Sequence, residues 1–143
     1  MVLPAIEAVD TSVASEIEES LLAELRQRFD QGHNTPITLT IKADDERFIA
    51  GLGGSTAYGW LLIKTLWVAP KWRGQGFGRA LVMDAMKRAA ALQCHGVWLD
   101  TSSRDAIAFY ESLGFEEFGT LENQQTQQQP LNHCRWFLRR QLY

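Results

Sequence analysis

The chain is poor in cysteine and carries little net charge, and each shortage excludes a class of protein. Its 143 residues include two cysteines, too few for the disulfide framework of a small secreted domain. A formal charge of −3 gives no general electrostatic reason to bind nucleic acid. No apolar run approaches the length of a membrane span, and the first residues lack the features of a signal peptide. We therefore expect one cytoplasmic domain over residues 1–143, without nucleic-acid or membrane partners.

Histidine is also scarce, and the placement of the few potential metal ligands argues against a metal site. Cys94 is adjacent to His95, and His133 is adjacent to Cys134. Adjacent residues on a strand point to opposite faces of a sheet, so each pair offers at most one ligand to a given ion. We therefore expect no metal.

Glycine, by contrast, is concentrated in a turn between a predicted strand and a predicted helix. The apolar run 60–68 predicts the strand, and Gly74, Gly76 and Gly78 follow it at alternate positions. These glycines let the backbone bend sharply and leave successive N–H groups uncovered. At a helix N-terminus such N–H groups are unpaired and carry the positive end of the helix dipole, so they form an anion site. Arg73 adds a cation, and the turn therefore predicts a phosphorylated cofactor.

Three glycine-rich signatures compete for this turn. A P-loop requires Lys and then Ser or Thr after its last glycine, but Arg79 and Ala80 stand here. A Rossmann fingerprint requires a third glycine where Leu81 stands. The run Arg73-Gly74-Gln75-Gly76-Phe77-Gly78 instead reads R-x-x-G-x-G. It resembles motif A of the GNAT superfamily, the acyl-CoA-dependent N-acyltransferases.

A second block of sequence extends the resemblance. Leu99-Asp100-Thr101, followed by the pattern A-x-x-F-Y-E-x-x-G-F over residues 106–115, is similar to a strand, helix and strand of the same superfamily. The two blocks stand in the right order and spacing. The resemblance implies a single GNAT-like α/β domain, with a mixed, mostly antiparallel central sheet flanked by helices. In that fold the two central strands, here 60–68 and 97–101, splay apart.

The resemblance also implies acetyl-CoA as cosubstrate and indicates where it binds. In the superfamily the glycine-loop amides hold the CoA pyrophosphate. Free amides at the end of the preceding strand hold the pantetheine arm and the acyl carbonyl, and the oxyanion donor is expected at Trp67 or Val68. Ser103 stands where relatives commonly carry an asparagine that contacts pantetheine, although a serine there also suits a helix N-cap. The predicted cofactor-binding residues are Leu66, Trp67, Val68, Arg73, Gly74, Gln75, Gly76, Phe77, Gly78, Arg79 and Ser103.

Acyl transfer to an amine also requires a base and a proton donor for the departing thiolate. Tyr110 falls where the superfamily places its tyrosine and is our candidate donor; the alternative is a core aromatic beside Phe109. The base is the open role, because Lys64 stands where relatives often carry an acid. A surface or rim lysine is the simpler interpretation of Lys64. Asp100 and His133 are the other candidates for the base. The alternatives are that His133 is an ordinary loop histidine and that a water chain to bulk solvent takes the proton without a dedicated residue.

The other segments predict ordinary elements. A glycine cluster at 51–54 has no helix after it and indicates a bulge or a tight strand crossing. In the implied topology the strands that begin near 95 and 134 are antiparallel, so their first residues lie at opposite ends of the sheet. We expect a helix over 12–30 capped by Ser15 and Glu18, strands over 37–43, 115–121 and 134–142, a second helix ending at Gly114, and an exposed glutamine-rich loop over 123–130. The helix that the glycine turn opens should bury an apolar stripe of Leu81, Val82, Ala85, Met86, Ala89 and Leu92.

These observations indicate an N-acetyltransferase that moves an acetyl group from acetyl-CoA to a primary amine of a small molecule or a protein, by direct attack in a ternary complex. Asp100 and Glu122 are compatible with a cationic acceptor. Two alternatives stay open at this point: a non-catalytic acyl-CoA-binding or regulatory module, suggested by Lys64 and Ser103, and a structural interaction domain. We also expect a homodimer, because the last strand, with Trp136 to Leu138, offers an edge or an apolar face.

Overall fold

The computed structural model describes residues 2–143, which divide into a short N-terminal unit ending at Gln31 and a larger unit, Gly32–Tyr143. The first unit contains a 3-10 turn, Thr11–Val13, and helix α1, Ala14–Arg28. This confirms the expected helix with slightly shorter bounds. The predicted cap by Ser15 and Glu18 is wrong, because the chain enters the helix through the 3-10 turn. Asp10 caps that turn by accepting a hydrogen bond from the Ser12 N–H at 2.9 Å.

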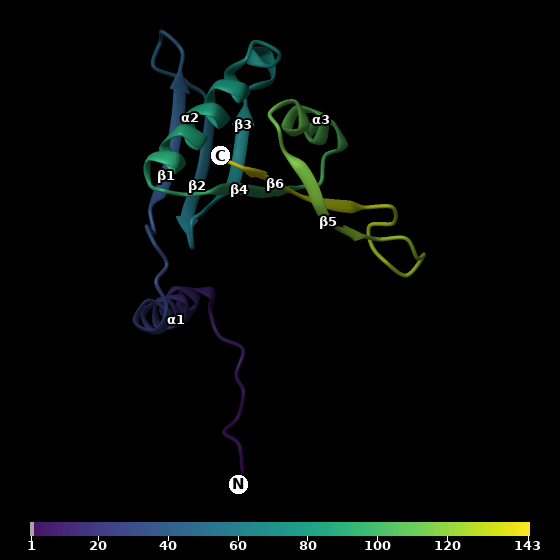
Figure 1. Ribbon diagram of the computed structural model, residues 1–143. Helices are drawn as coiled ribbons and strands as arrows, with labels where there is room; N and C mark the ends of the chain where they lie inside the picture. The colour runs from purple at the N-terminus through teal and green to yellow at the C-terminus, as the bar shows by residue number, and fades with distance from the viewer. Residues whose placement is uncertain (1) are drawn as a thin grey trace. The chain divides into compact units, whose positions relative to one another are not determined.

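The larger unit is a six-stranded sheet in the order β1-β2-β3-β4-β6-β5, seen in Figure 1. Only β3 and β4 are parallel, and every other neighbouring pair is antiparallel, which confirms the predicted mixed sheet. The strands are β1 Pro36–Lys42, β2 Phe48–Ala57, β3 Trp60–Val68, β4 Gly96–Thr101, β5 Glu116–Glu122 and β6 Cys134–Gln141, and the larger unit's helices are α2 Phe77–Ala91 and α3 Arg104–Ser112.

Strand β6 lies inside the sheet, between β4 and β5. The expectation that the last strand forms a sheet edge is therefore wrong, and Leu138 is fully buried. Strands β5 and β6 are antiparallel neighbours, and β5 takes the outer position. Gly96 of β4 pairs with Gln141, so the two Cys–His pairs lie at opposite ends of the sheet, as expected. Among residues 2–143 no cluster of three or more metal-ligating side chains exists.

Strands β3 and β4 pair over a short length and then separate. Their parallel ladder ends where Leu62 pairs with Trp98, so the rest of β3 has β2 on one side and no strand on the other. This confirms the predicted splay. It leaves backbone N–H and C=O groups of β3 facing an opening rather than a neighbouring strand.

A β-bulge lies on β3 just beyond that point. Gly54 pairs with Ile63 and Gly53 pairs with Thr65, so Lys64 is an extra residue without a partner on β2. The glycine cluster makes room for it, because a Cβ on Gly54 would collide with the carbonyl oxygen of Leu62. The bulge predicted at residues 51–54 is confirmed, and its extra residue lies on the partner strand β3. Lys64 and Thr65 are consequently both exposed, and the inward-facing set shifts from Ile63 to Leu66.

Helix α2 lies over β1 to β3, and α3 lies beside β4 (Figure 1). Helix α2 buries the predicted apolar stripe Leu81, Val82, Ala85, Met86 and Ala89. Ser103 caps α3 by accepting a hydrogen bond from the Ala106 N–H at 3.4 Å. Gly114 follows α3 with a φ of +89°, as its predicted terminator. No helix within the described chain has the length and apolarity needed to cross a membrane.

Candidate active site

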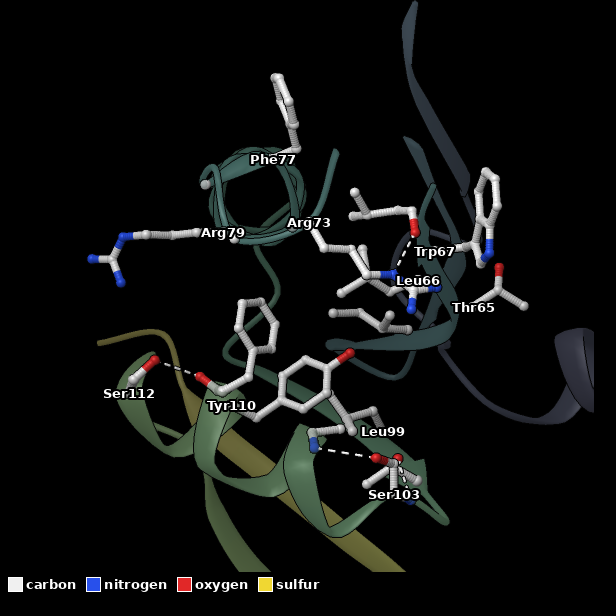
Figure 2. A pocket seen from close by; sticks show the side chains of 18 of the residues that line it. Thr65, Leu66, Trp67, Arg73, Phe77, Arg79, Leu99, Ser103, Tyr110 and Ser112 are labelled. Carbon is white, nitrogen blue, oxygen red and sulfur yellow. Dashed lines mark hydrogen bonds between the residues drawn. The ribbon is translucent and has the colours of Figure 1, made fainter. Parts of the chain in front are cut away.

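A cavity of about 1000 Å³ opens where β3 and β4 separate, between the N-terminus of α2 and helix α3 (Figure 2). Each helix follows a strand that borders this opening: α3 comes shortly after β4, and α2 follows β3 through a 3-10 turn, Pro70–Trp72, and the glycine turn. Strand ends and helix N-termini therefore meet at the cavity. Its lining includes most of the predicted site residues. They are Leu66, Trp67, Val68, Arg73, Gly74, Gly76, Phe77, Gly78, Arg79, Asp100, Ser103 and Tyr110.

The glycine turn presents bare backbone to this cavity. Gly74 and Gly76 have φ values of +76° and +90°, a conformation that favours glycine, and a Cβ on either would meet no atom within 4 Å. Helix α2 makes its first hydrogen bond from Ala80 N–H to the Gly76 carbonyl oxygen, at 3.0 Å. Gly76 supplies no side-chain cap, so the first N–H groups of α2 have no helical acceptor. This turn has the properties of an anion site at a helix N-terminus.

The end of β3 presents its own backbone groups to the same cavity. The N–H of Ala69 donates to the Ile49 carbonyl oxygen at 2.8 Å, so Ala69 faces β2. Backbone groups alternate along an extended strand, so those of Val68 and Leu66 face the opposite side, where β4 has separated. The N–H of Trp67 faces β2, and its ring stacks on Phe48 with centroids 5.6 Å apart. Of the two amides proposed as oxyanion donors, that of Val68 faces the opening.

Three side chains of the glycine turn and of the first turn of α2 differ in their relation to the cavity. Arg73 donates from Nε to the carbonyl oxygen of Val68 at 2.8 Å, which ties the turn to the strand end. Arg79 extends outward from the first turn of α2 (Figure 2). Gln75 does not line the cavity, and its side-chain amide donates to the Lys71 carbonyl oxygen at 3.4 Å.

Tyr110 belongs both to the core and to the cavity. Its ring packs between Phe109 and Phe115, with centroids 5.0 Å and 5.4 Å away, and the residue is 6% exposed. Its hydroxyl points into the cavity toward β3 (Figure 2). Burial disfavours the charged phenolate and raises the pKa of Tyr110 to about 12. The side chain therefore keeps its hydroxyl proton at neutral pH and can donate a hydrogen bond.

The model of the Acetyltransferase (GNAT) family matches residues 5–115. The chain belongs to the GNAT acetyltransferase family. It is 34% identical over 115 residues to acetyltransferase Atu2258 of Agrobacterium fabrum, covering 80% of this chain and 84% of that protein. A crystal structure of an Agrobacterium tumefaciens protein assigned to the acetyltransferases covers 99% of both chains with a TM-score of 0.82 and 29% identity. An acetyltransferase from Bacillus cereus shares the fold at 22% identity, with a TM-score of 0.80 over 96% of this chain and 97% of its own.

In this GNAT acetyltransferase the candidate bases occupy different places. Asp100 lines the cavity and forms an ion pair with Arg135, with Oδ1 and Nε 3.5 Å apart. His133 does not line the cavity, and its Nε2 lies 3.0 Å from Ser102 Oγ. Glu122 lies outside the cavity as well and hydrogen-bonds Gln124.

The acetyltransferase cavity also includes residues for which the sequence suggested no site role. Ile63 and Leu99 are the first residues beyond the last β3–β4 pair, and both are buried where the splay begins. Thr65 lines the cavity next to Lys64. Leu99 belonged to a motif, but the motifs could not show that these three residues line the cavity, because their positions depend on where the β3–β4 ladder ends and on the bulge.

Proposed function

We propose that this protein transfers the acetyl group of acetyl-CoA to a primary amine of a small molecule or a protein, by direct attack in a ternary complex. One observation carries the proposal: a single cavity joins the bare N-terminus of α2, the unpaired end of β3 and the Tyr110 hydroxyl. A streptothricin-acetyltransferase-like neighbour from Bacillus anthracis with this fold was crystallised with acetyl coenzyme A. The family membership and this neighbour support acetyl-CoA as the donor.

The glycine turn would hold the pyrophosphate. Gly74 and Gly76 leave space for the phosphate oxygens to approach the backbone, and the first amides of α2 would donate to them. Each hydrogen bond to a charged group contributes roughly 1.5–3 kcal/mol, so several together can hold a flexible cofactor. The pantetheine arm would then extend along the unpaired side of β3, past Val68 and Leu66, and bring the thioester toward Tyr110.

The reaction begins when the neutral amine nitrogen attacks the thioester carbonyl carbon, forming the C–N bond. The carbonyl oxygen becomes an oxyanion, for which the Val68 N–H is the donor that faces the opening. Collapse of this intermediate breaks the C–S bond, and the thiolate leaves. A thiol has a reference pKa of about 8.5, well below the pKa of Tyr110, so the phenol stabilises the thiolate by hydrogen bonding rather than by giving up its proton.

The nitrogen must also lose a proton during the reaction. Asp100 is our candidate acceptor, because it lines the cavity while His133 does not. Its carboxylate forms an ion pair with Arg135 and has oxygens that accept hydrogen bonds. A water molecule in the open cavity could connect the amine to this carboxylate or to bulk solvent.

The test uses two variants of Gly76 that differ in charge and hardly in size. Asn and Asp both tolerate a positive φ better than most residues, so Gly76→Asn controls for backbone strain and bulk. The carboxylate of Gly76→Asp should repel the pyrophosphate. We expect acetyl-CoA to raise the melting temperature of the wild type and of Gly76→Asn, and to have a much smaller effect on Gly76→Asp.

Turnover is then measured as release of free CoA with a panel of amines. Amine-dependent release by the wild type supports the transferase function. Binding of acetyl-CoA without release by any amine would instead identify a non-catalytic acyl-CoA-binding module. An equal acetyl-CoA response in Gly76→Asp and Gly76→Asn would place the cofactor elsewhere.

A further inference from the structure

Lys64 occupies a special position on β3. It is the extra residue of the bulge, has no partner on β2, and is exposed while lining the cavity. Bulges beside active sites commonly redirect a side chain. Alternation from the buried Ile63 places Lys64 on the exposed face, and the bulge puts Thr65 on that face beside it instead of on the buried face.

The charge of Lys64 is uncompensated. Within residues 2–143, no carboxylate lies within ion-pair distance of its ammonium group. The acidic residue of the cavity wall, Asp100, already forms an ion pair with Arg135. Arg73 and Arg79 belong to the turn at the α2 N-terminus. The other basic residue of the lining, Lys64, lies on β3 away from that turn and is available to a different anion.

A lone cation at this place has consequences for an amine acceptor. It repels an ammonium group and so favours the neutral amine that the attack requires. It attracts a negatively charged substituent on the same molecule. Thr65, the next residue, also lines the cavity, and its hydroxyl is a neutral hydrogen-bond donor beside the cation. This hydroxyl lies over Gly53, and a Cβ added to Gly53 would come within 2.8 Å of Thr65 Oγ1.

We propose that Lys64, with the Thr65 hydroxyl beside it, forms an acceptor subsite that binds a carboxylate or phosphate group carried by the amine substrate. This inference rests on the proposed function and specifies its substrate class. The charges of the cavity thus favour an acceptor that carries a negative group, whereas Asp100 and Glu122 suggested a cationic acceptor from the sequence.

The test compares matched amines that differ in one negative charge. Phosphoethanolamine is paired with ethanolamine, and β-alanine with β-alaninamide, so the two arms distinguish a phosphate from a carboxylate. We measure kcat/KM for each with the wild type, Lys64→Ala, Lys64→Glu and the control Lys87→Ala, which removes an exposed lysine of α2 outside the cavity. We expect the wild type and Lys87→Ala to prefer the anionic member of at least one pair by roughly tenfold. Lys64→Ala should lose this preference and Lys64→Glu should reverse it.

The possible failures are distinguishable. If the wild type acetylates both members of each pair at equal rates, the anion subsite is overturned and the transferase function is retained. An equal loss on both members in Lys64→Ala would also overturn it, because it would show a role that does not depend on substrate charge. Binding of acetyl-CoA with no acetylation of any amine would overturn the proposed function and this inference with it.

Discussion

The Arg73 side chain and the Val68 carbonyl oxygen are joined by a hydrogen bond of 2.8 Å from Nε. Val68 ends β3, and Arg73 opens the glycine turn, so this bond connects two stretches of backbone that face one cavity. The Val68 carbonyl oxygen is the acceptor, and the bond satisfies a strand-end group that has no partner on β4 because β4 has separated. It leaves the rest of the planar guanidinium free to donate elsewhere.

We expect Arg73→Lys to weaken acetyl-CoA binding by about tenfold, because lysine keeps the charge but lacks the Nε–H that contacts Val68. The measurement is the acetyl-CoA dissociation constant by calorimetry. Arg79→Lys is the matched control, since Arg79 extends outward from α2 and its charge is likewise kept (Figure 2). Equal effects of the two substitutions would show that charge alone matters at the turn.

For Tyr110→Phe we expect kcat to fall about a hundredfold while acetyl-CoA binding stays nearly unchanged, because only the hydrogen bond to the departing thiolate is lost. The ring keeps its packing against Phe109 and Phe115, so the melting temperature at neutral pH should also stay the same. Rapid-quench measurement of acetyl transfer separates this step from product release. A variant with full kcat would contradict the role proposed for the hydroxyl.

The same hydroxyl makes stability depend on alkaline pH. The pKa of Tyr110 is raised to about 12 in the folded protein, above its ordinary value of 10.0. The unfolded chain therefore ionises first, so this contribution to stability is complete below pH 10 and is lost as the pH rises toward 12. Between pH 9 and pH 11, roughly the onset of this loss, the urea midpoint of the wild type should fall more than that of Tyr110→Phe. The exposed control Tyr143→Phe should follow the wild type.

Sequence patterns identified the features of this site that are local in the chain. The glycine turn, the apolar stripe of α2, the Ser103 cap and the Gly114 terminator each depend on residues within a few positions of one another. The position of Tyr110 in the resembling motif also predicted a residue that lines the cavity.

Features that depend on strand pairing were less accessible. The place of β6 inside the sheet depends on which strand takes the edge, and the choice between Asp100 and His133 depends on which of them faces the opening. The glycines at 51–54 predicted a bulge, but which strand carries the extra residue is decided by register. The sequence left Lys64 as a surface or rim lysine, and the structure places it on the cavity wall.

Ile63 should limit the length of the acyl group, because its side chain lines the cavity at the point where β3 and β4 separate. We expect Ile63→Ala to raise the ratio of butyryl-CoA to acetyl-CoA turnover, at a stability cost of about 2–5 kcal/mol. Ile63→Val should show the same trend at a cost of about 0.5–1.5 kcal/mol. Val97→Ala is the control, since Val97 is fully buried in the paired part of β4 and does not line the cavity. An unchanged ratio in both Ile63 variants would place the acyl group elsewhere.

Comparing Asp100→Asn with His133→Gln shows which of the two residues acts as the base. We expect Asp100→Asn to lower kcat/KM for the amine about a hundredfold, because the carboxylate on the cavity wall is lost. His133→Gln should lower kcat/KM far less, since the side chain contacts Ser102 outside the cavity lining.

The Asn substitution also breaks the ion pair with Arg135, so Arg135→Gln is needed as a control that breaks the pair and keeps the carboxylate. An exposed ion pair contributes only about 0–1 kcal/mol, so Arg135→Gln should lower kcat/KM far less than Asp100→Asn. If Arg135→Gln proves as damaging, the pair matters for the shape of the wall and the carboxylate is not the base. If His133→Gln alone lowers kcat/KM about a hundredfold, the proton leaves through the loop that carries His133, and that loop must approach the acceptor during the reaction.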